Sequence, residues 1–175
     1  MADVKIAIEF VMKQEDPMLE GNVQNDTTDT GGRTRFGIAE RSHPHLTGTG
    51  FFDNMNRASA LALAEYTYNY EYAKPLSIVE IVSQTVANAL LSSAVNFGSL
   101  PAVKMLQRCL LVDQDGQIGP ASVRAINASN EIALLRGFAN EQLARYAKVV
   151  ANNPTQARFI NGWQNRVELA CGISA

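Results

Sequence analysis

Apolar residues recur at helical spacing over most of the chain, beginning with Val4, Ala7, Ile8, Val11 and Met12. Separations of three and four residues place such side chains on one face of an α-helix. With Asp3 available as the N-cap, we expect a first helix over about 4–15 that ends near Pro17. The following Met18 and Leu19 should be buried, which places Glu20 at the edge of the core.

The same reasoning predicts six further helices and little strand. A run rich in Ala and Leu predicts a helix from about Arg57 to Lys74, stopped by Pro75. A long, almost uncharged helix should cover about 77–97, with apolar residues around most of its circumference, as in a helix surrounded by others. The remaining helices are expected over 101–111, from Pro120, over 130–150, and over 154–170 with Gly172 beyond it.

The composition is that of a soluble globular protein. The chain has 175 residues, 46% apolar and 18% charged, enough for one core or a core divided between two lobes. No apolar run approaches the roughly 20 residues that span a bilayer, and the N-terminus does not resemble a secretory signal. We therefore expect synthesis in the cytoplasm, no stable membrane insertion, and a monomer.

Charge and cysteine content exclude further classes. A net charge of −2 without a basic cluster argues against nucleic acid as a partner. The two cysteines, Cys109 and Cys171, are too few for a disulfide framework and have no metal-ligand spacing. We interpret them as small buried hydrophobic residues.

The segment 20–38 is the one long polar stretch, rich in Gly, Thr and Asp, between strongly patterned apolar segments. A compact domain seldom keeps so long a loop without a function. We expect turns and a short irregular hairpin, because Gly31 and Gly32 permit positive φ. The loop contains three carboxylates: Glu20, Asp26 and Asp29.

Two chemistries are compatible with these carboxylates, beside the alternative of a merely solvated loop. Their spacing does not follow that of a calcium-binding loop, so we predict no metal and no cofactor. Glycoside hydrolysis needs one protonated carboxylic acid and one ionised carboxylate. Glu20 beside Leu19 is the better protonated acid, because desolvation penalises its charged form. Asp29 should stay solvated and ionised, and Asp26 is its rival.

The loop resembles the N-terminal signature of the glycoside hydrolase family 108 muramidases, Glu-Gly-Gly-Tyr, Asn-Asp-Pro-x-Asp-Pro-Gly-Gly and Thr-Asn-x-Gly-Ile. The matching residues are Glu20-Gly21, Asn25 to Gly32, and Thr34 to Ile38. Asn22-Val23 replace Gly-Tyr, Thr27 and Thr30 replace both prolines, and Arg35 replaces Asn. The resemblance continues through 94–98, 106–108, 115–120 and 159–167, of which Asp115 to Pro120 is the hallmark of the peptidoglycan-binding region that accompanies this family.

The order Glu20, Asp29, Thr34 is also similar to that of lysozymes of the bacteriophage T4 type. This resemblance implies a mainly α, lysozyme-like fold of two lobes with the active loop facing a cleft. Glu20 would be the general acid, Asp29 the base, and Thr34 the residue that positions water. Arg166 would support the acid.

Other residues receive secondary roles. Tyr70, Tyr72 and Asn96 are predicted to contact substrate, whereas Trp163 is interpreted as a core anchor. His43 and His45, in a loop around Pro44, should be exposed, and the turn at 115–120 is interpreted as structural.

The predicted function is hydrolysis of the bond between N-acetylmuramic acid and N-acetylglucosamine in bacterial peptidoglycan, by a phage endolysin that reaches the wall after the membrane is permeabilised. The alternatives are an inactive peptidoglycan-binding or phage structural module, and a chitinase-like hydrolase. We expect one folding unit, with a catalytic lobe at 1–95 and a helical, peptidoglycan-binding lobe at 96–175.

Overall fold

The computed structural model describes residues 1–25 and 32–173. This part of the chain is mostly helical, with a single two-stranded antiparallel sheet, so the predicted mainly α fold is confirmed. In order, its regular elements are α1 (Val4–Glu15), β1 (Thr34–Arg35), β2 (Ile38–Ala39), η1 (Pro44–Leu46), α2 (Arg57–Tyr68), η2 (Asn69–Ala73), η3 (Ile78–Glu80), α3 (Gln84–Phe97), α4 (Ser99–Leu110), α5 (Pro120–Ala128), α6 (Glu131–Asn152), η4 (Pro154–Phe159) and α7 (Ile160–Cys171).

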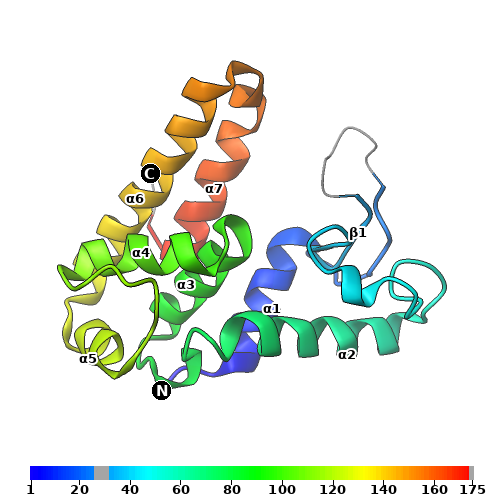
Figure 1. Cartoon of the computed structure of the whole chain (residues 1–175), viewed down its shortest axis with the longest axis horizontal. Helices are drawn as coiled ribbons and strands as arrows, with labels where there is room; N and C mark the ends of the chain where they lie inside the picture. The colour runs from blue at the N-terminus through cyan, green and yellow to red at the C-terminus, as the bar shows by residue number, and fades with distance from the viewer. Residues whose placement is uncertain (26–31, 174–175) are drawn as a thin grey trace.

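Helix α3 is the centre of the packing. It contacts α1, α4, α6 and α7, which surround it (Figure 1). A helix enclosed by others must be apolar on most sides, as predicted for this segment. Its buried residues are Val86, Ala87, Ala89, Leu90, Leu91, Ser92, Ser93 and Ala94.

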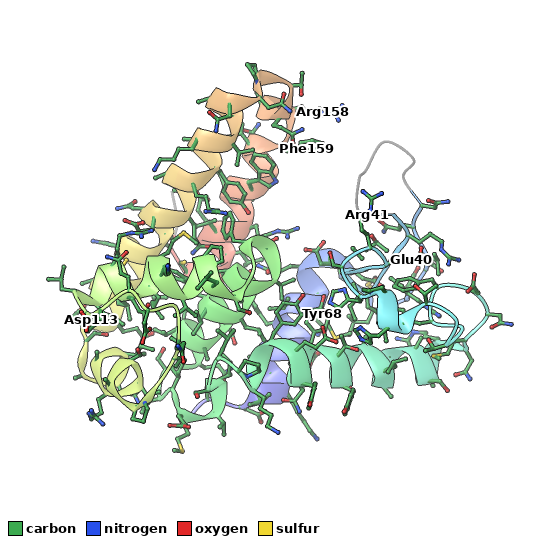
Figure 2. The ribbon with its side chains drawn as sticks, viewed as in Figure 1. Glu40, Arg41, Tyr68, Asp113, Arg158 and Phe159 are labelled. Carbon is green, nitrogen blue, oxygen red and sulfur yellow. The ribbon has the colours of Figure 1, made fainter. Side chains whose placement is uncertain are left out.

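The strand pair and the α6–α7 hairpin stand on opposite sides of α1 (Figure 1). Tyr68 of α2 lies near the middle of the molecule, where α1, α2 and the strand pair meet (Figure 2). Its hydroxyl donates a hydrogen bond of 3.0 Å to the carbonyl of Phe36. The side chain is buried, and burial raises the pKa of Tyr68. This contact fixes the strand pair above α2.

Local side-chain caps explain where most helices begin. Asp3 accepts a hydrogen bond of 2.8 Å from the amide of Lys5, so the predicted cap of α1 is confirmed. Asn130 accepts one of 3.0 Å from the amide of Ala133 at the start of α6. Gly172 follows α7, as predicted, and its left-handed conformation ends the helix.

The predicted helix over 77–97 is wrong in its first turns. Residues Ile78–Glu80 form the short helix η3, and α3 begins only after Ser83, whose hydroxyl caps the amide of Val86 at 3.1 Å. Asn127 of α5 stabilises the break between them. Its side chain accepts from the amide of Val82 at 2.8 Å and donates to the carbonyl of Glu80 at 2.9 Å.

Two other helices change type near an end. The helix predicted to run to Lys74 is α-helical to Tyr68 and continues as the π-helix η2. The last helix starts after the predicted cap Asn153 as the 3₁₀ segment η4 and becomes α-helical at Ile160. The predicted lengths are therefore correct, although the hydrogen-bond pattern varies along them.

Replacing Gly21 by Ala should destabilise the protein by about 2 kcal/mol or more. Gly21 has φ +68°, and an added Cβ would overlap the ring of the buried Phe36. The matched control is Gly162→Ala in α7, where the new Cβ meets nothing within 4 Å. This control should leave stability unchanged or raise it by up to about 1 kcal/mol. Urea unfolding measures both, and equal midpoints would contradict the role of Gly21.

Candidate active site

The predicted hairpin is present as the β1–β2 pair. Thr34 pairs with Ala39 and Arg35 with Ile38 in antiparallel register. The two turn residues, Phe36 and Gly37, both have positive φ, which is the conformation of a tight two-residue hairpin turn. Gln24 adds a bridge to Thr34 through two backbone hydrogen bonds of 2.8 Å.

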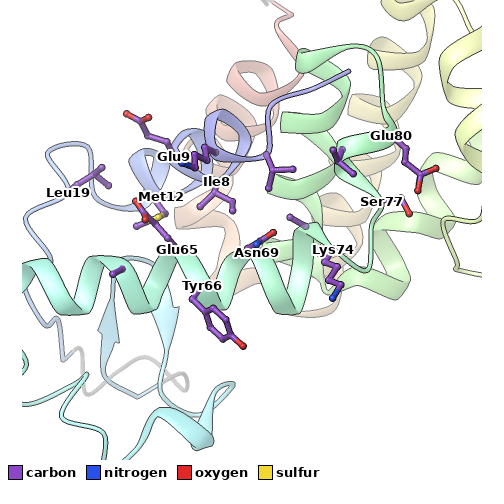
Figure 3. Close-up of a pocket in the computed structure, with 15 residues that line it drawn as sticks. Ile8, Glu9, Met12, Leu19, Glu65, Tyr66, Asn69, Lys74, Ser77 and Glu80 are labelled. Atoms are coloured by element: carbon purple, nitrogen blue, oxygen red, sulfur yellow. The ribbon is translucent and has the colours of Figure 1, made fainter.

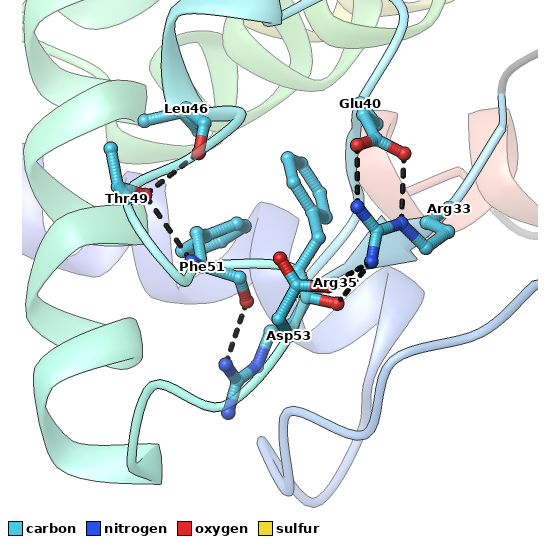
Figure 4. Close-up of polar contacts among 8 residues, drawn as sticks. Arg33, Arg35, Glu40, Leu46, Thr49, Phe51 and Asp53 are labelled. Atoms are coloured by element: carbon cyan, nitrogen blue, oxygen red, sulfur yellow. Dashed lines mark hydrogen bonds and ion pairs between the residues drawn. The ribbon is translucent and has the colours of Figure 1, made fainter.

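Arg35 anchors this hairpin to its surroundings. Its buried guanidinium donates to the carbonyls of Gly21 at 2.7 Å, Phe51 at 2.7 Å and Met55 at 3.0 Å. Figure 4 shows the contact with Phe51. Burial lowers the pKa of Arg35, and the three carbonyls satisfy the donors that burial removes from water. The start of the loop is thereby fixed to the segment 51–55.

Arg33 makes a second, more exposed set of contacts (Figure 4). It forms a bidentate pair with Glu40, at 2.7 and 2.9 Å, and a further ion pair with Asp53. The hydrogen bonds from Arg33 lower the pKa of Glu40, and those to Glu40 and Asp53 raise the pKa of Arg33. Arg33 therefore links Glu40, the residue after β2, to Asp53 in the loop before α2.

Glu20 is exposed, so the predicted position at the edge of the core is wrong. The reason is Asp16, whose carboxylate accepts from the amides of Glu20 at 3.1 Å and Gly21 at 2.7 Å. These bonds close a tight turn after α1 and leave the Glu20 side chain in solvent. Its carboxylate accepts a hydrogen bond of 2.8 Å from the side chain of Asn22.

Asp26 and Asp29 lie outside the described residues, so their predicted roles stay predictions. Thr34 is half-buried in a small pocket whose other lining residues are Glu15, Asp16, Asn22, Gln24, Phe36 and Gly37. Glu20 is not among them. Within 1–25 and 32–173, no group of three or more His, Cys, Asp or Glu side chains is arranged to hold a metal ion.

Arg166 contacts both Asn96 and Glu15, and the sequence reasoning missed Glu15. From α7, Arg166 Nη1 lies 2.5 Å from Glu15 Oε1 and also donates to Asn96 Oδ1. The side chains of Arg166 and Glu15 are 25% and 27% exposed, so water screens this ion pair only in part. The one available sequence signal was the position of Glu15 as the last residue of the predicted helix.

The turn of the hairpin packs directly on Glu15. A Cβ added at Gly37 would lie 2.6 Å from Glu15 Cγ and 2.7 Å from the Tyr68 hydroxyl. Only a glycine leaves room for both groups here. The strand pair, α1, α2 and α7 therefore converge on one carboxylate.

The two tyrosines predicted to contact glycan do not line the pocket around Thr34. Tyr70 is exposed and stacks on Tyr66 with ring centroids 5.8 Å apart. The hydroxyl of Tyr72 lies 3.2 Å from Nε2 of His43. His43 is buried, so its predicted exposure is wrong, whereas His45 is exposed as predicted.

A larger pocket, of about 990 Å³, lies between α1, α2 and the segment that follows them (Figure 3). It is lined by apolar and charged side chains, among them Ile8, Met12, Tyr66, Lys74 and Glu80. It includes none of Glu15, Glu20, Thr34, Asn96 and Arg166. Although this pocket is larger than the one around Thr34, we do not assign it as the catalytic site.

Two family models match the chain, and they divide it between them. The model described as Glycosyl hydrolase 108 matches residues 12–98, which include the hairpin, Glu15 and Asn96. The chain belongs to glycosyl hydrolase family 108. The model described as Predicted Peptidoglycan domain matches residues 101–168, which include Arg166. This family 108 protein is therefore a glycoside hydrolase that acts on peptidoglycan of the cell wall.

The fold is shared with a solved structure. The chain is similar to the protein described as "Structure of Brucella abortus SagA", with 25% sequence identity and a TM-score of 0.74. The match covers 97% of this chain and 91% of that chain. No curated protein matches the chain. None of the helices in the described ranges has the length and apolar composition needed to cross a membrane.

In this family 108 protein, a buried side chain holds the turn at 115–120. Gln107 is buried, and its amide donates to Asp115 at 2.7 Å and to the carbonyl of Gln117 at 3.0 Å. Its oxygen accepts from the amide of Gly116 at 2.9 Å. The hydrogen bond from Gln107 is the main cause that lowers the pKa of Asp115.

An aromatic stack joins the two C-terminal helices α6 and α7. Trp163 is half-buried, and its ring stacks on that of Tyr146 with centroids 4.6 Å apart. Trp163 therefore packs against the edge of the core, and its predicted role as a core anchor is only partly confirmed. Cys171 is buried and Cys109 half-buried, so the interpretation of the cysteines is confirmed for the first and only partly for the second.

Replacing Gln107 by Ala should lower the free energy of unfolding by about 2–3 kcal/mol, because buried partners lose their hydrogen bonds. Gln114→Ala is the matched control. Gln114 lies directly before this turn, is exposed, and accepts a hydrogen bond of 2.9 Å from Arg108. Its replacement should change stability by less than about 0.5 kcal/mol. Urea unfolding of both variants tests the difference, and equal losses would show that the Gln107 contacts do not hold the turn.

Proposed function

We propose that the protein is an N-acetylmuramidase that hydrolyses the bond between N-acetylmuramic acid and N-acetylglucosamine. The observation that carries the proposal is the family 108 match over residues 12–98, followed by the peptidoglycan domain over 101–168. In support, the hairpin places Thr34 in a pocket that contains a half-buried carboxylate. Such a pocket can hold a water molecule beside an acid, which glycoside hydrolysis requires.

The sequence motif assigns Glu20 as the general acid, Asp29 as the base and Thr34 as the residue that positions water. Asp26 is the alternative base. Inverting hydrolysis needs the two carboxyl groups about 6.5–9.5 Å apart, and about 5 Å favours a retaining mechanism. Of these residues, Thr34 is the one that lines the described pocket, which supports its assigned role.

Digestion of purified peptidoglycan should create reducing ends of N-acetylmuramic acid. Borohydride reduction and mass spectrometry of the products would then detect muramitol, with heat-inactivated protein as the control. Glucosaminitol in its place would contradict the proposed bond. Cleavage of chitin oligomers at a rate equal to that of peptidoglycan would favour the chitinase-like alternative.

The alternative from another class is an inactive peptidoglycan-binding or phage structural module. The same digestion separates the two, because such a module sediments with peptidoglycan and creates no new reducing ends. The glycosyl hydrolase match favours the enzyme.

We further propose that the enzyme acts as a phage endolysin. The cell-wall substrate supports a lytic role. Expression in the cytoplasm of a Gram-negative host should leave the culture turbid until the inner membrane is permeabilised with chloroform. Turbidity should then fall within minutes, whereas a vector control stays turbid. Lysis on induction alone, or no lysis after chloroform, would contradict this role.

A further inference from the structure

A groove of about 280 Å³ lies between helices α4 and α6, which pack against each other (Figure 1). Its charged lining residues are four cations and one carboxylate: Lys104, Arg108, Glu141, Arg145 and Lys148. We infer that this groove binds the acidic peptide stem that peptidoglycan carries on N-acetylmuramic acid. The inference rests on the proposed muramidase function, because the stem is attached to one of the two sugars that the cleaved bond joins.

The positive charge of this groove is a product of the fold. The chain as a whole has a net charge of −2, and the four cations come from two helices that are distant in sequence. On α6, Glu141, Arg145 and Lys148 follow one another at separations of four and three residues, which places them on one helix face. An anion that enters the groove is therefore attracted by several charges at once.

Most of this charge is available to a ligand. Arg108 pairs with Glu141 at 2.9 Å and also donates to Gln114. Among the described residues, no carboxylate forms an ion pair with Lys104, Arg145 or Lys148. Both Arg145 and Lys148 are exposed, so each of them adds little alone, and binding depends on several contacts made together.

The remaining lining residues are apolar: Leu100, Pro101, Met105 and Ala144. A peptide stem presents the methyl groups of alanine, the carboxylates of γ-linked glutamate and of its C-terminus, and the amino group of a diamino acid. The methyl groups match the apolar lining, the carboxylates match the cations, and the amino group matches Glu141. A phosphate polymer has no group that matches Glu141, so these residues favour the stem.

The length of the groove also suits a short peptide. Helix α4 rises about 12 Å from Leu100 to Arg108, both of which line the groove. About three to four extended residues have this length. A stem can therefore lie along α4 with its carboxylates beside α6.

The turn at 115–120 borders this groove. A Cβ added at Gly116 would lie 2.2 Å from Leu100 Cδ1 and 3.4 Å from Lys104 Cε. The turn that Gln107 holds thus fixes two of the α4 side chains that line the groove. This contact links the hallmark sequence of the C-terminal region to the proposed binding of stems.

The groove is joined to the proposed active site by a series of side-chain contacts. The guanidinium of Arg145 lies 5.5 Å from the ring centroid of Phe97, at the end of α3. The preceding residue, Asn96, accepts a hydrogen bond from Arg166. Arg166 pairs with Glu15, which lines the same pocket as Thr34. Binding of the stem on this side of the molecule would add affinity for the sugar that carries it.

The test is hydrolysis of soluble glycan strands with and without stems, followed by release of reducing ends. The groove variant combines Arg145→Glu with Lys148→Glu. Its matched control combines Arg124→Glu with Arg136→Glu, the same change of charge at exposed positions that do not line the groove. On strands with stems, the groove variant should show a KM about tenfold higher, because two attractions become repulsions. Its kcat should change by less than about threefold.

Removal of the stems tests the same contact from the substrate side. It should raise the KM of the wild type and of the control about tenfold, and it should have little further effect on the groove variant. An unchanged KM of the groove variant on strands with stems would overturn the inference and leave the muramidase function standing. If that variant instead loses sedimentation with phosphatidylglycerol vesicles, the groove binds anionic lipid and the inference is wrong.

Failure of the proposed function gives a different result, because the wild type would then release no muramic acid ends. Binding of the tetrapeptide L-Ala-γ-D-Glu-meso-diaminopimelate-D-Ala still tests the groove. Shifts of the Arg145 and Lys148 amide resonances on its addition would support the inference, and unchanged resonances would overturn it. Thermal unfolding checks that the variants are folded. If the double groove variant does not unfold cooperatively, Lys148→Glu alone replaces it. Its KM should rise about threefold, and an unchanged KM would contradict the inference.

Discussion

The N-terminal half of the structure depends on one buried cation. The guanidinium of Arg35 donates to three backbone carbonyls, from Gly21, Phe51 and Met55, that belong to segments with no regular secondary structure. Backbone carbonyls that leave water need donors, and a planar group with several N–H bonds can serve three at once. The loop before β1 and the loop before α2 are therefore held by a side chain rather than by a sheet. This explains how a sheet of two-residue strands can support a defined pocket.

Most of the helices could be predicted because the signals that define them are local. Asp3, Asn130 and Gly172 act on residues within one turn, so the sequence beside them is sufficient. The break before α3 was missed because part of its cause is distant. Asn127 of α5 supplies the hydrogen bonds that replace those of a continuous helix at Glu80 and Val82. A run of apolar residues carries no information about such a partner.

The site was predictable in its chemistry and less so in its geometry. The motif placed Thr34 on a hairpin and drew attention to Arg166 and Asn96, which do meet. It could not show that Asp16 turns Glu20 toward solvent. Nor could it show that Arg166 reaches Glu15, because that pair joins the first and last helices. The burial of His43 likewise depends on the carbonyl of Ala39 and the hydroxyl of Tyr72.

The pairing of Glu15 with Arg166 has a consequence for the order of events during synthesis. Glu15 ends the first helix and Arg166 lies in the last, so α7 must be in place before Glu15 has this partner. Because a ribosome releases the chain from its N-terminus, the residues matched by the hydrolase family emerge long before α7. Glu15 therefore cannot pair with Arg166 until α7 has been synthesised. Contacts of such long sequence separation also form late in folding, since a large loop must be closed first. Docking of α7 thus supplies the ion pair that holds Glu15, a residue that lines the pocket.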